Sequence, residues 1–226
     1  MKVFLDIETI PAQPEEATKL EIAKSIKAPA KMTKAETIAD WHQGNGKYAG
    51  VKDAAIEEAY RKTSFDGARG EVCSIAWKAE GYDACSVSRA EGSEEHILKE
   101  FVESIPCQTG GRPPVFVGQY VAGFDLKFLF HRLIINNVNP KFKLPFDGRH
   151  GKDFYCTQAA WAGFGGRMSQ DNLCKALGIE GKPGDIDGSK VWDFYKAGKI
   201  DRIEEYNRHD VETVEKIYNR INFKEQ

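Results

Sequence analysis

Two acidic residues stand two positions apart near the start of the chain, in the run from Phe4 to Thr9. If this run is a strand, side chains alternate between its faces, so Asp6 and Glu8 project to one side, about 7 Å apart along the strand. Two carboxylates at the end of a buried strand are unfavourable together, and a divalent cation that bridges their oxygens is the usual resolution. Because D-x-E is a common tripeptide, a strand-end turn with two solvated carboxylates is the alternative interpretation.

A third acidic residue, Asp125, lies where an apolar segment gives way to a turn that contains Gly123 and then to a helical pattern. The most common role of an acid at this place is a favourable interaction with the dipole of the helix that follows. Taken alone, Asp125 is therefore only a candidate for a functional carboxylate.

The last predicted helix, residues 201–221, carries one acid on its inward face. Three- and four-residue steps define that face as Ile203, Tyr206, Asp210, Val214, Ile217 and Ile221. A carboxylate on an apolar face needs a partner, so Asp210 pairs either with a buried Arg or Lys or with a metal ion. Tyr206 lies one turn earlier, where its hydroxyl could reach whatever Asp210 holds or its ring could belong to the core.

The elements that must position these residues alternate between strands and helices. Apolar runs and turn signals predict strands at residues 2–8, 71–79, 82–88 and 114–118. Periodicity and capping residues predict helices at 93–104, 124–136, 169–178, 189–198 and 201–221. A strand followed by a helix, as at 114–136, is the order of a parallel crossover. We expect an α/β fold, with a mixed sheet flanked by helices.

The segment of residues 12–70 has a different character from the rest of the chain. It is charged and rich in Lys and Ala, and it has helical periodicity at residues 15–27, 34–41 and 52–62. We interpret it as a helical insertion after the first strand, within a single domain of residues 1–226.

Composition limits the classes of protein to which the chain can belong. The 226 residues are 41% hydrophobic and 29% charged, with a formal net charge of −2, so no broad basic surface for coating nucleic acid is expected. No apolar run is long enough to span a bilayer, and we expect a cytoplasmic protein without membrane partners. The cysteines form no C-x-x-C pair, which argues against disulfides and zinc ribbons: Cys73, Cys85, Cys107, Cys156 and Cys174.

Together the acidic motifs resemble those of the DEDD superfamily of 3′-to-5′ exonucleases. That superfamily has D-x-E on the first strand, an Asp at a helix start and, in one subclass, Y-x-x-x-D on the last helix. Here these motifs read Asp6-Ile7-Glu8, Phe124-Asp125 and Tyr206-Asn207-Arg208-His209-Asp210. The other subclass has His five positions before the last Asp, where Glu205 stands, so the chain is similar to the tyrosine subclass. The resemblance implies a ribonuclease-H-like sheet.

The segment of residues 121–132 is similar to the second exonuclease motif of family-B DNA polymerase proofreading domains. Residues 63–67 and 184–192 also resemble stand-alone relatives of those domains, many of them encoded by phages, for which the location would be the host cytoplasm. The likeness extends over residues 1–220. Many relatives have Asn where this chain has Tyr120 and His where it has Gln119. Since that Asn helps to position the substrate strand, Tyr120 bears on strand preference and rate.

The resemblance also implies a cofactor and a role for each motif residue. Two divalent cations about 4 Å apart would be held, with Asp6 contacting both, Glu8 and Asp210 completing one site and Asp125 supporting the other. Ligand sets made only of oxygen favour Mg²⁺ or Mn²⁺ over zinc. Tyr206 would orient the attacking water, because a phenol with a reference pKa near 10 is a poor base at neutral pH.

The expected substrate is DNA with a free 3′ end, which is digested to nucleoside monophosphates. Thr9, Ile10, Phe124 and Tyr120 are candidates to contact the terminal nucleotides, although ordinary packing explains the first three equally well. Three alternatives stay open. The same chemistry on RNA, a nucleic-acid-binding module without turnover, and a purely structural α/β protein in which Asp210 pairs with Arg or Lys all fit the sequence. The sequence identifies no polymerase partner.

Overall fold

The computed structural model describes residues 1–106, 114–163, 165–181 and 184–224. The chain divides into two compact units. The first unit consists of Met1–Thr9 and Val72–Gln226, and the second consists of Ile10–Glu71.

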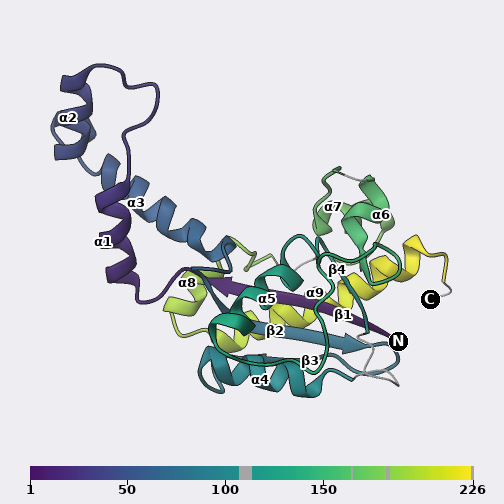
Figure 1. The fold of residues 1–226 in the computed structure, drawn as a ribbon. Coiled ribbons are helices and arrows are strands. Elements are labelled where there is room, and N and C mark those ends of the chain that lie inside the picture. The colour runs from purple at the N-terminus through teal and green to yellow at the C-terminus, as the bar shows by residue number, and fades with distance from the viewer. Residues whose placement is uncertain (107–113, 164, 182–183, 225–226) are drawn as a thin grey trace. The chain divides into compact units, whose positions relative to one another are not determined.

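The first unit is built on a five-stranded sheet with the strand order β3-β2-β1-β4-β5. The strands are β1 (Lys2–Ile10), β2 (Glu71–Ala79), β3 (Cys85–Ser88), β4 (Val115–Gly118) and β5 (Phe154–Cys156). β4 is parallel to both β1 and β5, β3 is antiparallel to β2, and Figure 1 shows β1 and β2 pointing in opposite directions. This mixed sheet confirms the predicted α/β fold and is consistent with a ribonuclease-H-like arrangement.

Helices of the first unit cover both faces of the sheet. They are α4 (Glu94–Ser104), α5 (Asp125–Ile135), α6 (Thr157–Ala162), α7 (Gln170–Leu177), α8 (Val191–Lys196) and α9 (Ile200–Ile221). Side chains of the central strand β1 alternate between two cores, as the two-residue period of a strand requires. Leu5 and Ile7 are buried in the core that includes α4 and α5, whereas Phe4 is buried with Val211 and Val214 of α9. The residues of β1 that share the face of Phe4 are therefore directed toward α9.

Glu94 is a buried acid that ties α4 to α5 and β2. Its carboxylate accepts two hydrogen bonds from Arg132, from Nε at 2.8 Å and from Nη2 at 2.5 Å. The main-chain N–H of Val72 and the side-chain amide of Asn136 donate to the same carboxylate, at 2.7 and 2.9 Å. These contacts fix the position of α5, whose first residue is Asp125.

The observed elements differ in part from those predicted from the sequence. The structure adds the strand β5 and the short helix α6, and β3 begins at Cys85 instead of at residue 82. β5 has only three residues, and it is a strand because it pairs with β4, where Phe116 lies beside Phe154. No local pattern of three residues predicts such a pairing. The predicted helices at 169–178, 189–198 and 201–221 correspond to α7, α8 and α9.

The second unit is helical. It contains α1 (Glu15–Ser25), α2 (Ala35–Gln43) and α3 (Val51–Lys62), together with short 3₁₀ turns at Gly46–Tyr48 and Thr63–Phe65. Between α1 and α3, the ammonium of Lys19 contacts the carboxylates of Glu15 at 2.6 Å and Glu57 at 2.5 Å. The unit covers nearly the same residues as the predicted insertion. Its interpretation as an insertion in a single domain stays a prediction.

Two further findings concern the cysteines and the helices. Cys73, Cys85, Cys156 and Cys174 form no disulfide with one another, and Cys107 lies outside the described residues. Within the described ranges, no helix combines the length and apolar character needed to cross a membrane.

Candidate active site

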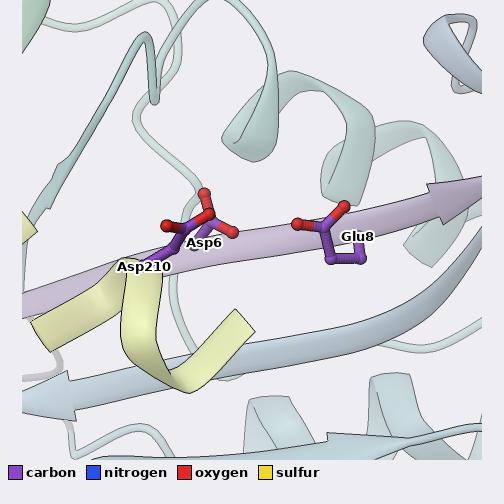
Figure 2. Close-up of side chains that lie close together, drawn as sticks. All are labelled: Asp6, Glu8 and Asp210. Carbon is purple, nitrogen blue, oxygen red and sulfur yellow. The ribbon is translucent and has the colours of Figure 1, made fainter. Parts of the chain in front are cut away.

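Three of the four predicted carboxylates meet at one place in the first unit. One oxygen each of Asp6, Glu8 and Asp210 lies within 4.8 Å of the other two. Asp6 and Glu8 come from β1 and Asp210 comes from α9, and the carboxylate of Glu8 points toward the other two (Figure 2). The structure therefore brings together three carboxylates from one face of β1 and one face of α9.

The packing of β1 and α9 explains why Asp6 and Asp210, about 200 residues apart in the sequence, lie close together. Asp6 and Glu8 alternate with Leu5 and Ile7, whose side chains fill the core on the opposite face. On α9, Asp210 belongs to a buried stripe of residues and is only 2% exposed. Apolar neighbours on both elements therefore hold the backbone that directs these carboxylates at one another.

The fourth carboxylate, Asp125, lies in the same pocket but outside the group of three. It is 3% exposed at the first residue of α5, where it accepts a hydrogen bond at 3.2 Å from the main-chain N–H of Ile7. Burial raises the pKa of the Asp125 carboxyl to about 7, and the charge of Asp210 acts in the same direction. Asp125 is therefore close enough to Asp210 for their charges to interact.

Uncharged donors hold the aspartates of the group. The side-chain amide of Asn207 donates to Oδ2 of Asp6 at 2.8 Å, and that of Gln170 donates to Oδ1 of Asp210 at 3.0 Å. Tyr206, which is 1% exposed, forms a side-chain hydrogen bond with Asp210. Burial, followed by the charges of Glu8, Asp210 and Asp6, raises the pKa of the Tyr206 phenol far above its usual value. Both effects favour the protonated form of its hydroxyl.

The carboxylates open into a pocket of about 450 Å³. Besides the acids and Tyr206, it is lined by Ile7, Gln119, Phe124, Gln158, Arg167, Met168, Ser169, Gln170 and Gly188. A larger cavity of about 620 Å³, near the end of α9, has a mostly apolar lining without any carboxylate. We take the smaller pocket as the candidate site because it contains the acids.

Several pocket residues were not predicted from the sequence. Gln119 carried a signal, because it stands where relatives have His, and Gly188 belongs to a segment that resembles relatives. Gln119 is held by two hydrogen bonds of 2.5 Å, one that it donates to the main-chain oxygen of Met168 and one that it accepts from Thr157. No sequence pattern marked Gln158 of α6 or Arg167, which follows α6, since only the fold brings them beside the carboxylates of β1.

The predicted substrate-contact residues lie in different surroundings. Phe124 lines the pocket, whereas Thr9, Ile10 and Tyr120 do not. Thr9 is half-buried, and the side chain of Ile10 is fully buried. Substrate contact by these four residues stays a prediction.

Tyr120 has an unusual backbone for an aromatic residue, with φ at 61°. The residue is 52% exposed, and its ring lies over Gly123, where a Cβ atom would come within 2.3 Å of a ring carbon. Glycine at position 123 therefore leaves the space that the ring of Tyr120 occupies.

The donor set fits a divalent cation of the oxygen-binding kind. Three carboxylates whose oxygens lie within 4.8 Å of one another supply only hard oxygen ligands, which suit Mg²⁺ or Mn²⁺. Carboxylates packed so closely repel one another unless a positive charge is shared between them. The residues present therefore match the cofactor that the motifs imply.

Comparison with known proteins identifies one family. A family described as "Predicted 3'-5' exonuclease related to the exonuclease domain of PolB" matches residues 68–225. No curated protein matches the chain significantly. The matched range includes Asp125, Tyr206 and Asp210, and the sheet adds Asp6 and Glu8 to them from β1. Because the match covers more than half of its residues, the chain belongs to this family of predicted 3′-to-5′ exonucleases.

Proposed function

We propose that the chain removes nucleotides one at a time from single-stranded 3′ ends of DNA, by hydrolysis that depends on two divalent cations. The observation that carries this proposal is the meeting of Asp6, Glu8 and Asp210 within 4.8 Å, in a pocket that also contains Asp125. Membership of the exonuclease family supplies the polarity.

The four carboxylates would hold the cations. Asp6, Glu8 and Asp210 would form one site, and Asp6 with Asp125 would form the other. Divalent cations in such sites lower the pKa of water and neutralise negative charge on the phosphate and on the leaving oxygen. A cation beside Asp125 would also oppose the effect of burial on the pKa of this carboxyl and favour its ionised form.

Tyr206 would act as a hydrogen-bond donor. Burial and the neighbouring carboxylates raise the pKa of the phenol, so the cation-free protein favours its protonated form. Its hydroxyl lies beside Asp210 and lines the pocket, so it can orient a water molecule or a phosphate oxygen there. With a reference pKa near 10, a phenol is also better suited to donating a hydrogen bond than to acting as a general base at neutral pH.

The pocket suits the end of a nucleic-acid strand better than the middle of a nucleic-acid duplex. Its volume of about 450 Å³ is in the range of sites for small molecules, roughly 300–1,000 Å³. Phe124 offers an aromatic face against which a base could stack, and Arg167 offers a positive charge for a phosphate. The net charge of −2 agrees with contacts limited to a few nucleotides.

Digestion of 5′-labelled single-stranded DNA with Mg²⁺ or Mn²⁺ tests the proposal. The native chain should produce a ladder that shortens from the 3′ end, and EDTA, Asp6→Ala and Asp210→Ala should each abolish it. Glu212→Ala is the matched control, because it removes the same charge from an exposed position on α9. A parallel RNA oligonucleotide distinguishes an exoribonuclease, and no cleavage of either substrate by folded native protein would contradict the enzyme proposal.

A further inference from the structure

A fully buried amide lies beside the carboxylate group. Asn207 is 0% exposed on α9, three residues before Asp210. Its Nδ2 donates to Oδ2 of Asp6 at 2.8 Å. Its Oδ1 accepts a hydrogen bond at 3.3 Å from the hydroxyl of Ser74, a residue of β2 that is also 0% exposed. The hydrogen bonds among Ser74, Asn207 and Asp6 thus link β2, α9 and β1.

The donor and acceptor in each of these hydrogen bonds follow from the chemistry of the three side chains. An amide has one oxygen that only accepts and one nitrogen that only donates, and an ionised carboxylate only accepts. The nitrogen of Asn207 must therefore face Asp6, and the hydroxyl of Ser74 must donate to the remaining oxygen. A flipped amide would place its oxygen against the carboxylate and leave the hydrogen bond from Ser74 without an acceptor.

Gln170 does the same for a second carboxylate. It is 6% exposed at the first residue of α7, where the side chain of Ser169 caps the helix by accepting from the N–H of Asn172. Its Nε2 lies 3.0 Å from Oδ1 and 3.4 Å from the main-chain oxygen of Asp210. One amide therefore binds both the side chain and the backbone of this aspartate.

We propose that Asn207 and Gln170 are positioning residues, which fix the orientation of the Asp6 and Asp210 carboxylates for cation binding. The inference rests on the proposed function. Both donors are uncharged, so they orient the carboxylates without neutralising them, as Arg or Lys would. The buried hydrogen bonds restrict rotation of each of the two carboxylates.

Near-isosteric variants test this inference. Asn207→Leu and Gln170→Met keep approximate shape and remove the donor. Each variant should lower either the Mn²⁺ affinity of the substrate-free protein or kcat by about 10- to 100-fold, as loss of the hydrogen-bond partners of metal ligands does. Electron paramagnetic resonance measures the Mn²⁺ affinity. KM for the oligonucleotide should stay within about two-fold, because neither amide is assigned to the strand.

A double-mutant cycle tests whether Ser74 acts through Asn207. Ser74→Ala removes one hydroxyl and should give a smaller loss than Asn207→Leu. In the Asn207→Leu background it should have no further effect on Mn²⁺ affinity, because Ser74 acts only through the amide. Since Ser74→Ala is a mild change, it keeps the test decisive if Asn207→Leu does not fold.

A buried polar residue on the same helix provides the control. Thr213 is 0% exposed and contacts His209 at 3.5 Å, so Thr213→Val should change stability without changing Mn²⁺ affinity. Folded Asn207→Leu and Gln170→Met proteins with native Mn²⁺ affinity and native kcat would overturn the inference. A different outcome separates the two proposals. If the native protein cleaves no nucleic acid but both variants bind Mn²⁺ more weakly than it does, the positioning role is upheld and the proposed function is contradicted.

Discussion

The two faces of the sheet bury acidic residues in different ways. On the face of α4 and α5, Glu94 is 5% exposed and makes a bidentate ion pair with Arg132. On the face of α9, Asp6, Glu8 and Asp210 lie within 4.8 Å of one another, and the amides of Asn207 and Gln170 orient two of them. Arg132 neutralises Glu94 within the fold, whereas the two amides orient aspartates without adding a positive charge.

Removing one acid of the group should have the largest effect on activity. Asp210→Asn keeps the shape of the side chain, and we expect it to lower kcat by about 10³-fold or more, equivalent to about 4 kcal/mol. The same change should leave the free energy of unfolding in EDTA unchanged or higher, because one of three like charges is removed. Digestion rates and urea unfolding measure the two effects. A large loss of stability in EDTA would show that Asp210 is a structural acid like Glu94.

Removing the acid on the other face should have the opposite pattern. Glu94→Gln leaves Arg132 buried without its counter-charge, which should lower the free energy of unfolding by about 3–5 kcal/mol. Urea unfolding measures this loss. Under conditions where the variant is folded, kcat should stay within about three-fold of native. If kcat fell as far as in Asp210→Asn, the assignment of a structural role to Glu94 and a catalytic role to Asp210 would be wrong.

Divalent cations should stabilise the folded protein by binding at the group of Asp6, Glu8 and Asp210. At a concentration 100 times the dissociation constant, binding to the folded state adds about 2.7 kcal/mol to the free energy of unfolding. We expect Mn²⁺ to raise the Tm of the native chain and of Glu212→Ala, and to raise that of Asp210→Asn much less. Thermal unfolding with and without Mn²⁺ gives the comparison. Equal shifts in all three proteins would place cation binding elsewhere.

Loss of the phenol should have the smallest of these effects. Tyr206→Phe keeps the buried ring and removes one hydrogen bond to a charged group, so kcat should fall about ten-fold, equivalent to about 1.4 kcal/mol. Steady-state kinetics on the labelled oligonucleotide measure this change. A loss as large as that of Asp210→Asn would mean that Tyr206 does more than donate a hydrogen bond.

The parts of the site that sequence predicted are those that follow from local periodicity. The two-residue period of β1 placed Asp6 and Glu8 on one face, and the stripe on α9 placed Asp210 inward. Asn207 lies on the same inward face, three residues before Asp210, but an amide gives no hydrophobic signal. The pattern of apolar residues therefore passed over it.

The remaining parts depend on contacts between distant segments. Gln170 is 40 residues from Asp210, and Arg132 is 38 residues from Glu94. No periodicity relates residues at such separations, and only the packing of α7 near α9, or of α5 against α4, brings them together. The strand β5 was missed for the same reason, since its three residues are ordered by pairing with β4.

Counting the Mn²⁺ ions bound by the substrate-free chain tests the central claim most directly. Electron paramagnetic resonance titration of the native chain, Asp6→Ala and Glu212→Ala distinguishes the acidic group from other acids on the surface. We predict two bound ions for the native chain and for Glu212→Ala, and the loss of both in Asp6→Ala, since Asp6 is assigned to both sites. Equal binding by all three proteins would contradict the assignment of the carboxylate group as the catalytic metal site.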